Sequence, residues 1–317
     1  MVEEKAEETK KETKIETQGR KKEEHIQKTN WYNKHYKILL ILPIIMFVFS
    51  IFYLFQFNAN HGDIVLKDIS LTGGTSVTVF DEGVDIDELK STLRAEFPDL
   101  IVRKILDIRT RNQQAFIVET RSGVEEVKTA LEKYLGYQLN QDNSSIEFSG
   151  SAISQGFYQQ LRFALFISFI LMATVVFIIF RTPIRSLSVI IASFADIIMT
   201  IVVVDILGIQ LSTAGIVALL MLIGYSVDVD ILLTTRVFKD KEGTLNQRIF
   251  GAFKTGITMT LTAIAAVGIA LLFTYSLSPT LSQMFIIIII GLGFDILNCW
   301  ITNASILKWY MEAKKLT

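Results

Sequence analysis

The chain has 317 residues, half of them hydrophobic, and a formal net charge of −1 at neutral pH. Its mean hydropathy of +0.42 excludes a purely soluble chain and indicates an integral membrane protein with one appended polar domain. The single cysteine, Cys299, excludes an intrachain disulfide. The three histidines lie outside the apolar runs, so no metal site is suggested, and we expect neither a cofactor nor a nucleic-acid partner.

Residues 1–36 are rich in lysine and glutamate and contain almost nothing apolar, which predicts a disordered, charged cytoplasmic tail. The first hydrophobic run, 37–57, predicts a transmembrane helix with aromatic anchors such as Tyr36 and Tyr53 at its ends. This run begins too late for a cleavable signal and has no small-residue cleavage site, so we expect none.

The polar domain spans 58–158. Its runs predict the order strand, helix, strand, strand, helix, strand, which is the split motif of an α+β ferredoxin-like domain. Asp85 and Ser122 are expected to cap the two helices. Nothing in the domain resembles an acid–base pair or an activated nucleophile, so the chain is not expected to be an enzyme.

A glycine-rich stretch opens the polar domain and consists of Thr72, Gly73, Gly74 and Thr75. A strand rather than a helix is predicted to follow it, which excludes a phosphate-binding loop. A close backbone approach or a bulge is the better explanation for the paired glycines.

Five more apolar runs lie within 159–310, before a cytoplasmic tail of 311–317. They predict transmembrane helices over, in chain order, 161–180, 187–207, 211–237, 253–275 and 281–309. With the first run, this gives a multi-pass α-helical membrane protein of six spans. The connections after the second and fourth helices carry arginine and lysine, whereas those after the third and fifth carry neither. This asymmetry predicts cytoplasmic termini and an extracytoplasmic polar domain.

The fourth predicted helix carries two carboxylates, Asp228 and Asp230. Asp228 would lie about 26 Å from Leu211 and about 12 Å from Arg236, which is within the hydrocarbon. An aspartate at a helix centre costs about 2.5–3.5 kcal/mol on insertion scales, which favours an ionisable functional group inside the membrane. The alternative is that both side chains lie near the interface and point at water.

Asp228 and Asp230 are two positions apart, about 200° around the helix, so they face different neighbours. Asp228 shares its side with Gly224 and Tyr225, and Asp230 shares its side with Ser226. Because glycine permits closer helix packing than serine, Asp228 is expected to be the acid inside the bundle. Asp230 would then be the more hydrated acid, or a contact to another subunit.

Other predicted spans carry further candidates. Asp196 lies near the middle of the third helix, although it could simply be hydrogen-bonded to a neighbouring serine such as Ser193 or to a serine on another helix. Asp205, close to the end of that helix, is expected to be interfacial. A stripe in the sixth helix consists of Asp295, Asn298 and Thr302, and one in the fifth of Lys254, Thr258 and Thr262. For Lys254, ordinary snorkelling to the interface is an equally good explanation. Acids deep in three spans cost on the order of 8–10 kcal/mol, which membrane residence alone would not sustain.

These motifs, in this order, resemble the SecF family, the smaller partner in the SecDF complex of the resistance-nodulation-division superfamily. They are TGGT outside the first span, FR after the second, an Asp in the third and IGYS followed by acids in the fourth, and the resemblance covers roughly residues 30–317. In the family pattern IGYS-(apolar)-N-D-(S/T), the Asn position holds Asp228, the Asp position Val229 and the Ser/Thr position Asp230, which looks like the archaeal version. Ala195 replaces the family's histidine beside Asp196, and Lys254 stands where bacterial relatives usually carry arginine.

The resemblance implies a subunit that acts with SecD, a second six-span protein, beside the Sec translocon in the cell membrane. The ferredoxin-like domain would help to hold or release the translocating polypeptide, and an ion gradient would act through the intramembrane acids. Two alternatives remain at this point. One is a half-transporter of the same superfamily that exports lipids or small molecules, and the other is a structural translocon subunit without ion flow.

Overall fold

The computed structural model describes residues 31–107, 110, 112–239, 243–275 and 278–314, and structural statements below concern these residues. Most of the predicted disordered tail, up to residue 30, lies outside the described residues. Its last part, 31–36, belongs to a short helix, α2 (Trp31–Leu39). The first long helix, α3, is therefore preceded by a short amphipathic helix and not by an irregular segment.

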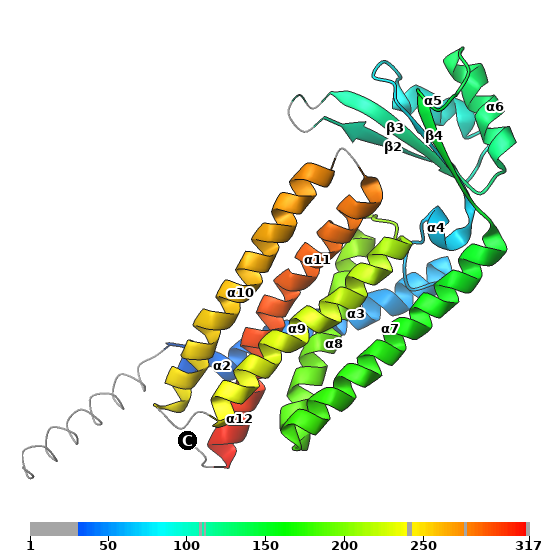
Figure 1. Ribbon diagram of the computed structural model, residues 1–317. Helices are drawn as coiled ribbons and strands as arrows, with labels where there is room; N and C mark the ends of the chain where they lie inside the picture. The colour runs from blue at the N-terminus through cyan, green and yellow to red at the C-terminus, as the bar shows by residue number, and fades with distance from the viewer. Residues whose placement is uncertain (1–30, 108–109, 111, 240–242, 276–277, 315–317) are drawn as a thin grey trace, which may run out of the picture.

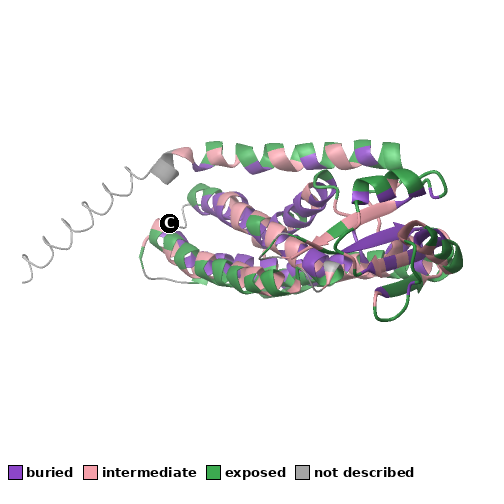
Figure 2. Cartoon of the chain, turned by 90° about the horizontal axis from the view of Figure 1, so that it is seen from above, coloured by how far each residue is buried: buried purple, intermediate pink, exposed green. Residues whose placement is uncertain are grey.

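The described chain has six helical spans that are long and apolar enough to cross a membrane, as predicted. They are built from α2 with α3 (Ile41–His61), α7 (Ser151–Phe180), α8 (Pro183–Ile206), α9 (Thr213–Lys239), α10 (Leu245–Thr274), and α11 (Pro279–Leu297) with its continuation. That continuation is a π-helix, η1 (Asn298–Asn303), followed by α12 (Ala304–Ala313). α8 is the most buried span, whereas α10 exposes most of its surface. Viewed from above, buried residues gather between the helices (Figure 2).

At one end of the bundle lies a small α+β unit, residues 74–149, called the sheet unit below (Figure 1). Its elements follow in the order β1 (Gly74–Val79), α5 (Ile86–Leu93), β2 (Ile101–Leu106), β3 (Gln113–Thr120), α6 (Val124–Leu135) and β4 (Ser144–Ser149). The strands form one antiparallel sheet in the order β2-β3-β1-β4. This is the element order that the hydrophobic pattern predicts.

The sheet unit has its own apolar core, separate from that of the bundle. Val77 of β1 pairs with Val118 of β3, and both side chains are fully buried under α5 and α6. Asp85 caps α5 as predicted, because its carboxylate accepts the backbone N–H groups of Asp87 and Glu88. The prediction for Ser122 is wrong, since Gly123 is the N-cap residue of α6 and no side chain caps it.

The glycine-rich stretch joins the sheet unit to the bundle. Gly73 and Gly74 have positive φ angles of 83° and 144°, which side chains rarely adopt. A Cβ on Gly73 would lie 2.4 Å from the Cα of Ser151 at the start of α7. A Cβ on Gly74 would lie 2.4 Å from the backbone oxygen of Thr120. The paired glycines therefore permit a close backbone approach, which agrees with the structural interpretation of this motif.

Residues 62–73, called the linker below, connect α3 to β1 and bond to the turn between α8 and α9. The backbone N–H of Asp68 donates to the Leu211 carbonyl at 3.0 Å, and the N–H of Leu211 donates to the Leu66 carbonyl at 2.6 Å. The Leu66 N–H also donates to the buried carboxylate of Asp205 at 3.2 Å. Asp205, which is expected to be interfacial, lies near the end of α8, where the linker covers its side chain.

The second span begins earlier than its hydrophobic run. β4 leads through Gly150 directly into α7, which starts at Ser151, whereas the sequence assigned residues up to 158 to the polar domain. The first turns of α7 are polar, and so they were not counted with the apolar run. The helix thus extends without a break from the sheet unit into the bundle.

Candidate functional site

Three aspartates from three helices lie buried together in the middle of the bundle. They are Asp196 of α8, Asp230 of α9 and Asp295 of α11, with exposed fractions of 1%, 0% and 1%. Their charges lie within electrostatic range of one another. None of the three forms an ion pair with a described residue. We call these three side chains the carboxyl cluster.

Asp196 is held by neutral hydrogen-bond donors from two other helices. The Ser226 hydroxyl of α9 donates to Asp196 Oδ2 at 2.6 Å, and the Asn298 amide of η1 donates to Asp196 Oδ1 at 2.8 Å. Ser226 also contacts Ser193, whose hydroxyl lies 3.4 Å away. The hydrogen bond expected for Asp196 comes from this more distant serine, and it ties α8 to α9.

Asp230 is bonded on one oxygen only. The Asn303 amide of η1 donates to Asp230 Oδ1 at 2.8 Å, and Asp230 Oδ2 has no hydrogen-bonding partner in the described chain. The Thr234 hydroxyl, one turn further along α9, and the Asn303 amide oxygen are also buried without partners. Buried polar atoms without partners are uncommon in folded proteins, so this cluster requires an explanation.

Asp295 has no hydrogen-bonding partner on either carboxylate oxygen among the described residues. The hydroxyls of Ser226 and Thr260 lie beside it, and the Thr260 hydroxyl donates to the Gly256 carbonyl of its own helix at 3.2 Å. A carboxylate without a donor in an apolar interior costs several kcal/mol, so its charge has to be balanced by another group.

The π-helix η1 explains how two asparagines five positions apart both reach the carboxyl cluster. In an α-helix Asn298 and Asn303 would point about 140° apart, whereas the wider i→i+5 turn of a π-helix aligns them. Asn298 therefore bonds to Asp196 while Asn303 bonds to Asp230. Asn298 is predictable from the sequence but Asn303 is not, because a regular 3.6-residue period places Asn303 on another face.

Apolar layers close the carboxyl cluster on both sides along the bundle. Towards the sheet unit, Leu219, Leu222 and Ile287 belong to one buried hydrophobic cluster. Towards the other end, Leu233 and Leu307 belong to a second. The carboxyl cluster is therefore enclosed by apolar side chains on both sides in this conformation.

Asp228 lies apart from the carboxyl cluster, so the expectation that it packs inside the bundle is wrong for this chain. The side chain is exposed on α9, as are Gly224 and Tyr225, whereas Ser226 and Asp230 face inward. Gly224 would favour Asp228 only if the closest helix contact at Gly224 lay within this chain. Here Gly256 of α10 makes that contact instead, since a Cβ there would lie 2.5 Å from the Trp300 ring.

The stripe on the fifth span also faces away from the acids. Lys254, Thr258 and Thr262 are exposed on α10, and the two threonine hydroxyls donate to backbone carbonyls of their own helix. Thr260, two positions from each, is the threonine of α10 that faces the cluster. Of the predicted site residues, the structure brings together Asp196, Asp230, Asp295 and Asn298, and the Thr302 hydroxyl donates to the Asn298 amide oxygen at 3.1 Å.

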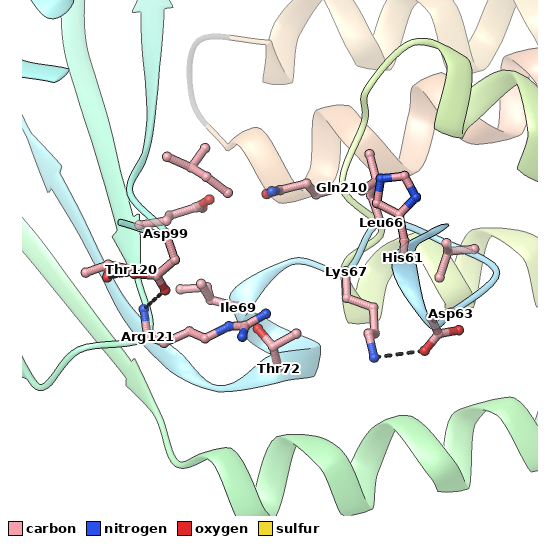
Figure 3. Close-up of a pocket in the computed structure, with 13 residues that line it drawn as sticks. His61, Asp63, Leu66, Lys67, Ile69, Thr72, Asp99, Thr120, Arg121 and Gln210 are labelled. Atoms are coloured by element: carbon pink, nitrogen blue, oxygen red, sulfur yellow. Dashed lines mark hydrogen bonds and ion pairs between the residues drawn. The ribbon is translucent and has the colours of Figure 1, made fainter. Parts of the chain in front are cut away.

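A separate cavity of about 310 Å³ lies where the linker, the sheet unit and the bundle meet (Figure 3). Lys67 pairs with Asp63 at 2.8 Å on one wall, and Asp99 accepts the Arg121 backbone N–H at 2.8 Å on the other. His61 lies at the end of α3 beside them. The charged groups of this cavity come from the linker on one wall and from the sheet unit on the other. The cavity therefore lies at the junction between the bundle and the sheet unit.

Comparisons with known proteins agree on one family. The family model "Protein export membrane protein SecD/SecF, C-terminal" matches residues 127–313. Protein-export membrane protein SecF of Methanothermobacter thermautotrophicus is 37% identical over 284 residues, which are 89% of this chain and 94% of that protein. SecF of Methanocaldococcus jannaschii is 35% identical over 292 residues, or 89% of this chain and 99% of that protein.

Among solved structures, the fold is similar to that of SecDF, a translocon-associated membrane protein from Thermus thermophilus. The TM-score is 0.72 at 17% sequence identity, and the match covers 89% of this chain. The chain spans only 39% of the length of that SecDF chain. At this identity the likeness concerns the fold.

Proposed function

Because this chain belongs to the SecF family of protein-export membrane proteins, it is an auxiliary subunit of Sec translocation, and we propose that it couples export to an ion gradient through Asp196, Asp230 and Asp295. We assign it no chemical reaction of its own. The observation that carries the proposal is the carboxyl cluster, three buried acids without a basic partner among the described residues. Their charge must be balanced by an ion that binds from outside, and this balance can change during a cycle.

We place both termini in the cytoplasm and the sheet unit outside, as a ferredoxin-like domain between the first and second spans. The strand order β2-β3-β1-β4 supports this class. The basic residues Arg185 and Arg236 lie in the first turn of α8 and in the last turn of α9. These two helix ends point away from the sheet unit (Figure 1). This distribution supports the proposed orientation by the positive-inside rule.

The linker offers a route from the ion site to the sheet unit. Asp196 and Asp230 lie on α8 and α9, and the turn joining these two helices is bonded to the linker at Leu66 and Asp68. When an ion binds or leaves, the packing of α8 against α9 changes, because Ser226 bridges them at Asp196. A shift of their common turn would then move the linker and, with it, the sheet unit.

We further propose that a second six-span membrane protein, similar to SecD, covers the outward face of α9. That face presents Gly224, Tyr225 and Asp228, and an ionisable side chain facing lipid in a membrane helix is costly. The similar SecDF chain is more than twice as long as the part that this chain spans. The partner would therefore complete the assembly beside the translocon and shield Asp228.

The proposal is tested by export in cells that depend on this subunit. Asp196, Asp230 and Asp295 are replaced singly by Asn, and both the rate of export of a pulse-labelled secretory protein and co-purification with the SecD-like subunit are measured. We expect normal assembly with slow export that no longer responds to collapse of the ion gradient. Normal export in all three variants would leave a structural subunit without ion flow.

Photocrosslinking from the sheet unit tests the substrate. A photoreactive residue placed at the exposed Phe148 of β4 should capture nascent polypeptide during export. Capture of lipids alone would instead indicate a half-transporter. The same probe at the exposed Phe273 of α10, on the membrane bundle, serves as the control.

A further inference from the structure

Three buried oxygen atoms near Asp230 have no partner in the described chain, and they come from three different chemical groups. They are Asp230 Oδ2, the Thr234 hydroxyl and the Asn303 amide oxygen, and the three side chains are all 0% exposed. The Asn303 amide nitrogen donates to the other Asp230 oxygen at 2.8 Å, which fixes Asn303 beside the carboxylate. Thr234 lies one turn from Asp230 on the same face of α9.

Thr234 is unusual among the described helical threonines in how its hydroxyl is used. Thr174 and Thr260 donate to the carbonyl four residues earlier, at 2.8 Å and 3.2 Å, as threonines in apolar helices commonly do. The Thr234 hydroxyl makes no such bond although it is buried. Its lone pairs and those of Asp230 and Asn303 are therefore all available to a common ligand.

We propose that Asp230, Thr234 and Asn303 bind one dehydrated alkali-metal cation of sodium size. This inference rests on the proposed function and names the ion that it uses. A carboxylate, a hydroxyl and an amide carbonyl are hard oxygen ligands, suited to a hard cation. The described residues contain no group of three or more His, Cys, Asp or Glu side chains placed to hold a metal ion, which disfavours a transition metal.

A proton and a cation would use these groups differently. A protonated Asp230 donates to one neighbouring oxygen and the Thr234 hydroxyl can donate to another, so protonation is the competing state that the salt series below distinguishes. A cation contacts all three oxygens at once and balances the charge of Asp230, which has no ion pair in the described chain. Asp295 lies within electrostatic range and strengthens the attraction for a positive ion.

The test is thermal unfolding of the purified full chain in lipid nanodiscs, with NaCl, KCl or choline chloride at equal ionic strength and fixed pH. We expect sodium to raise the melting temperature in a saturable way, by about 2–4 °C, because a ligand that binds only the folded state stabilises it. Potassium and choline should give smaller shifts or none. Equal melting temperatures in the three salts would overturn the proposal.

Thr234→Val removes one ligand without changing the shape of the side chain. We expect the sodium concentration for half of the maximal shift to rise at least about tenfold, which corresponds to about 1.4 kcal/mol of binding free energy. Thr174→Val is the matched control, since its hydroxyl bonds to its own helix on α7, and it should keep the wild-type sodium response. A Thr234→Val response equal to that of wild type would also overturn the site.

This readout separates the two proposals. Ion-coupled export predicts that Asp→Asn variants of the carboxyl cluster lose export, whichever ion is used. If those variants lose export while sodium leaves the melting temperature unchanged, the coupling stands and the sodium site is wrong. If sodium stabilises the chain while export is unaffected by the variants, the site stands and the coupling is wrong.

Discussion

The carboxylates of the sheet unit and those of the membrane bundle differ in how many hydrogen-bond donors they have. In the sheet unit, Asp85 accepts two backbone N–H groups at the start of α5, and Asp99 accepts the Thr120 hydroxyl and the Arg121 N–H, each at 2.8 Å. Glu119 is paired with Arg103. In the bundle, the acids of the carboxyl cluster accept hydrogen bonds from the amides of Asn298 and Asn303 and from the hydroxyl of Ser226, and several of their oxygens have no partner among the described residues.

The acids of the sheet unit therefore stabilise the fold, whereas those of the carboxyl cluster lower its stability. A carboxylate with matched donors contributes about 0.5–1.5 kcal/mol per hydrogen bond to stability, and somewhat more when charged. A buried carboxylate without a partner contributes a penalty instead. Each kind should therefore respond to amide substitution in its own way, stability changing in one region and activity in the other.

The largest expected effect is that of Asp295→Asn. Because neither Asp295 oxygen has a partner, the substitution breaks no hydrogen bond and removes a potential buried charge. We expect export to fall at least about tenfold while the melting temperature stays the same or rises. The measurement pairs a pulse-labelled export assay with thermal unfolding. A marked loss of stability together with normal export would reverse the comparison.

The second effect concerns the joint between the two regions. Gly73→Ala places a Cβ 2.4 Å from the Ser151 Cα at a φ of 83°, so the backbone of the linker or of α7 must shift. We expect a loss of about 1–3 kcal/mol in stability and faster proteolysis of the linker. Gly150→Ala is the control, because its Cβ would meet only a side-chain methyl group at 4.0 Å. Equal behaviour of the two variants would show that the joint does not depend on this close approach.

The sequence predicts the structure of the sheet unit and the helical spans better than it predicts the site inside the bundle. The six spans and the order of elements in the sheet unit follow from local periodicity, and the structure has both. The paired glycines were also interpreted correctly as a close approach. The spans and the order of elements depend on neighbours in sequence, which is the information that a hydrophobic pattern contains.

The inner site could be predicted only in part, because it depends on which helix faces which. Asp196, Asp295 and Asn298 were identified, but the choice between Asp228 and Asp230 was wrong. A glycine one turn away signals a close contact without saying whether that contact lies within the chain. Asn303 was missed because a π-helix changes the period locally, and no residue pattern in the segment announces this change.

A third effect, of similar size, tests the packing that closes the carboxyl cluster. Gly256→Ala on α10 would bring a Cβ within 2.5 Å of the Trp300 ring and 3.0 Å of Val229, which pushes α10 away from α9 and η1. We expect about 1–3 kcal/mol of destabilisation. On the same helix, Gly268→Ala meets no atom within 4 Å and should stabilise the helix by about 0.5–1 kcal/mol. Thermal unfolding of both variants is the measurement, and the same sign for both would contradict this packing.

The smallest effect is a pH dependence confined to the sheet unit. Burial alone would raise the pKa of Asp99, but hydrogen bonds from the Arg121 N–H and the Thr120 hydroxyl outweigh it and hold the pKa below its usual value of 3.8. A carboxyl whose pKa is lowered in the folded state stabilises the fold above the unfolded value, and this contribution is lost as the pH falls through the folded value. The protection of the β2 and β3 amides, which is the exchange rate compared with the intrinsic rate at the same pH, should therefore fall below about pH 4.

Asp99→Asn is the matched variant for that measurement. It should exchange faster than wild type at pH 6, because the weaker amide acceptor cannot replace both charge-assisted bonds, and the difference should shrink as the pH falls below 3.8. Export should stay normal at neutral pH, in contrast to Asp295→Asn. A constant difference between variant and wild type at every pH would mean that the Asp99 charge does not stabilise the sheet unit, and the contrast between the carboxylates of the two regions would then fail at this residue.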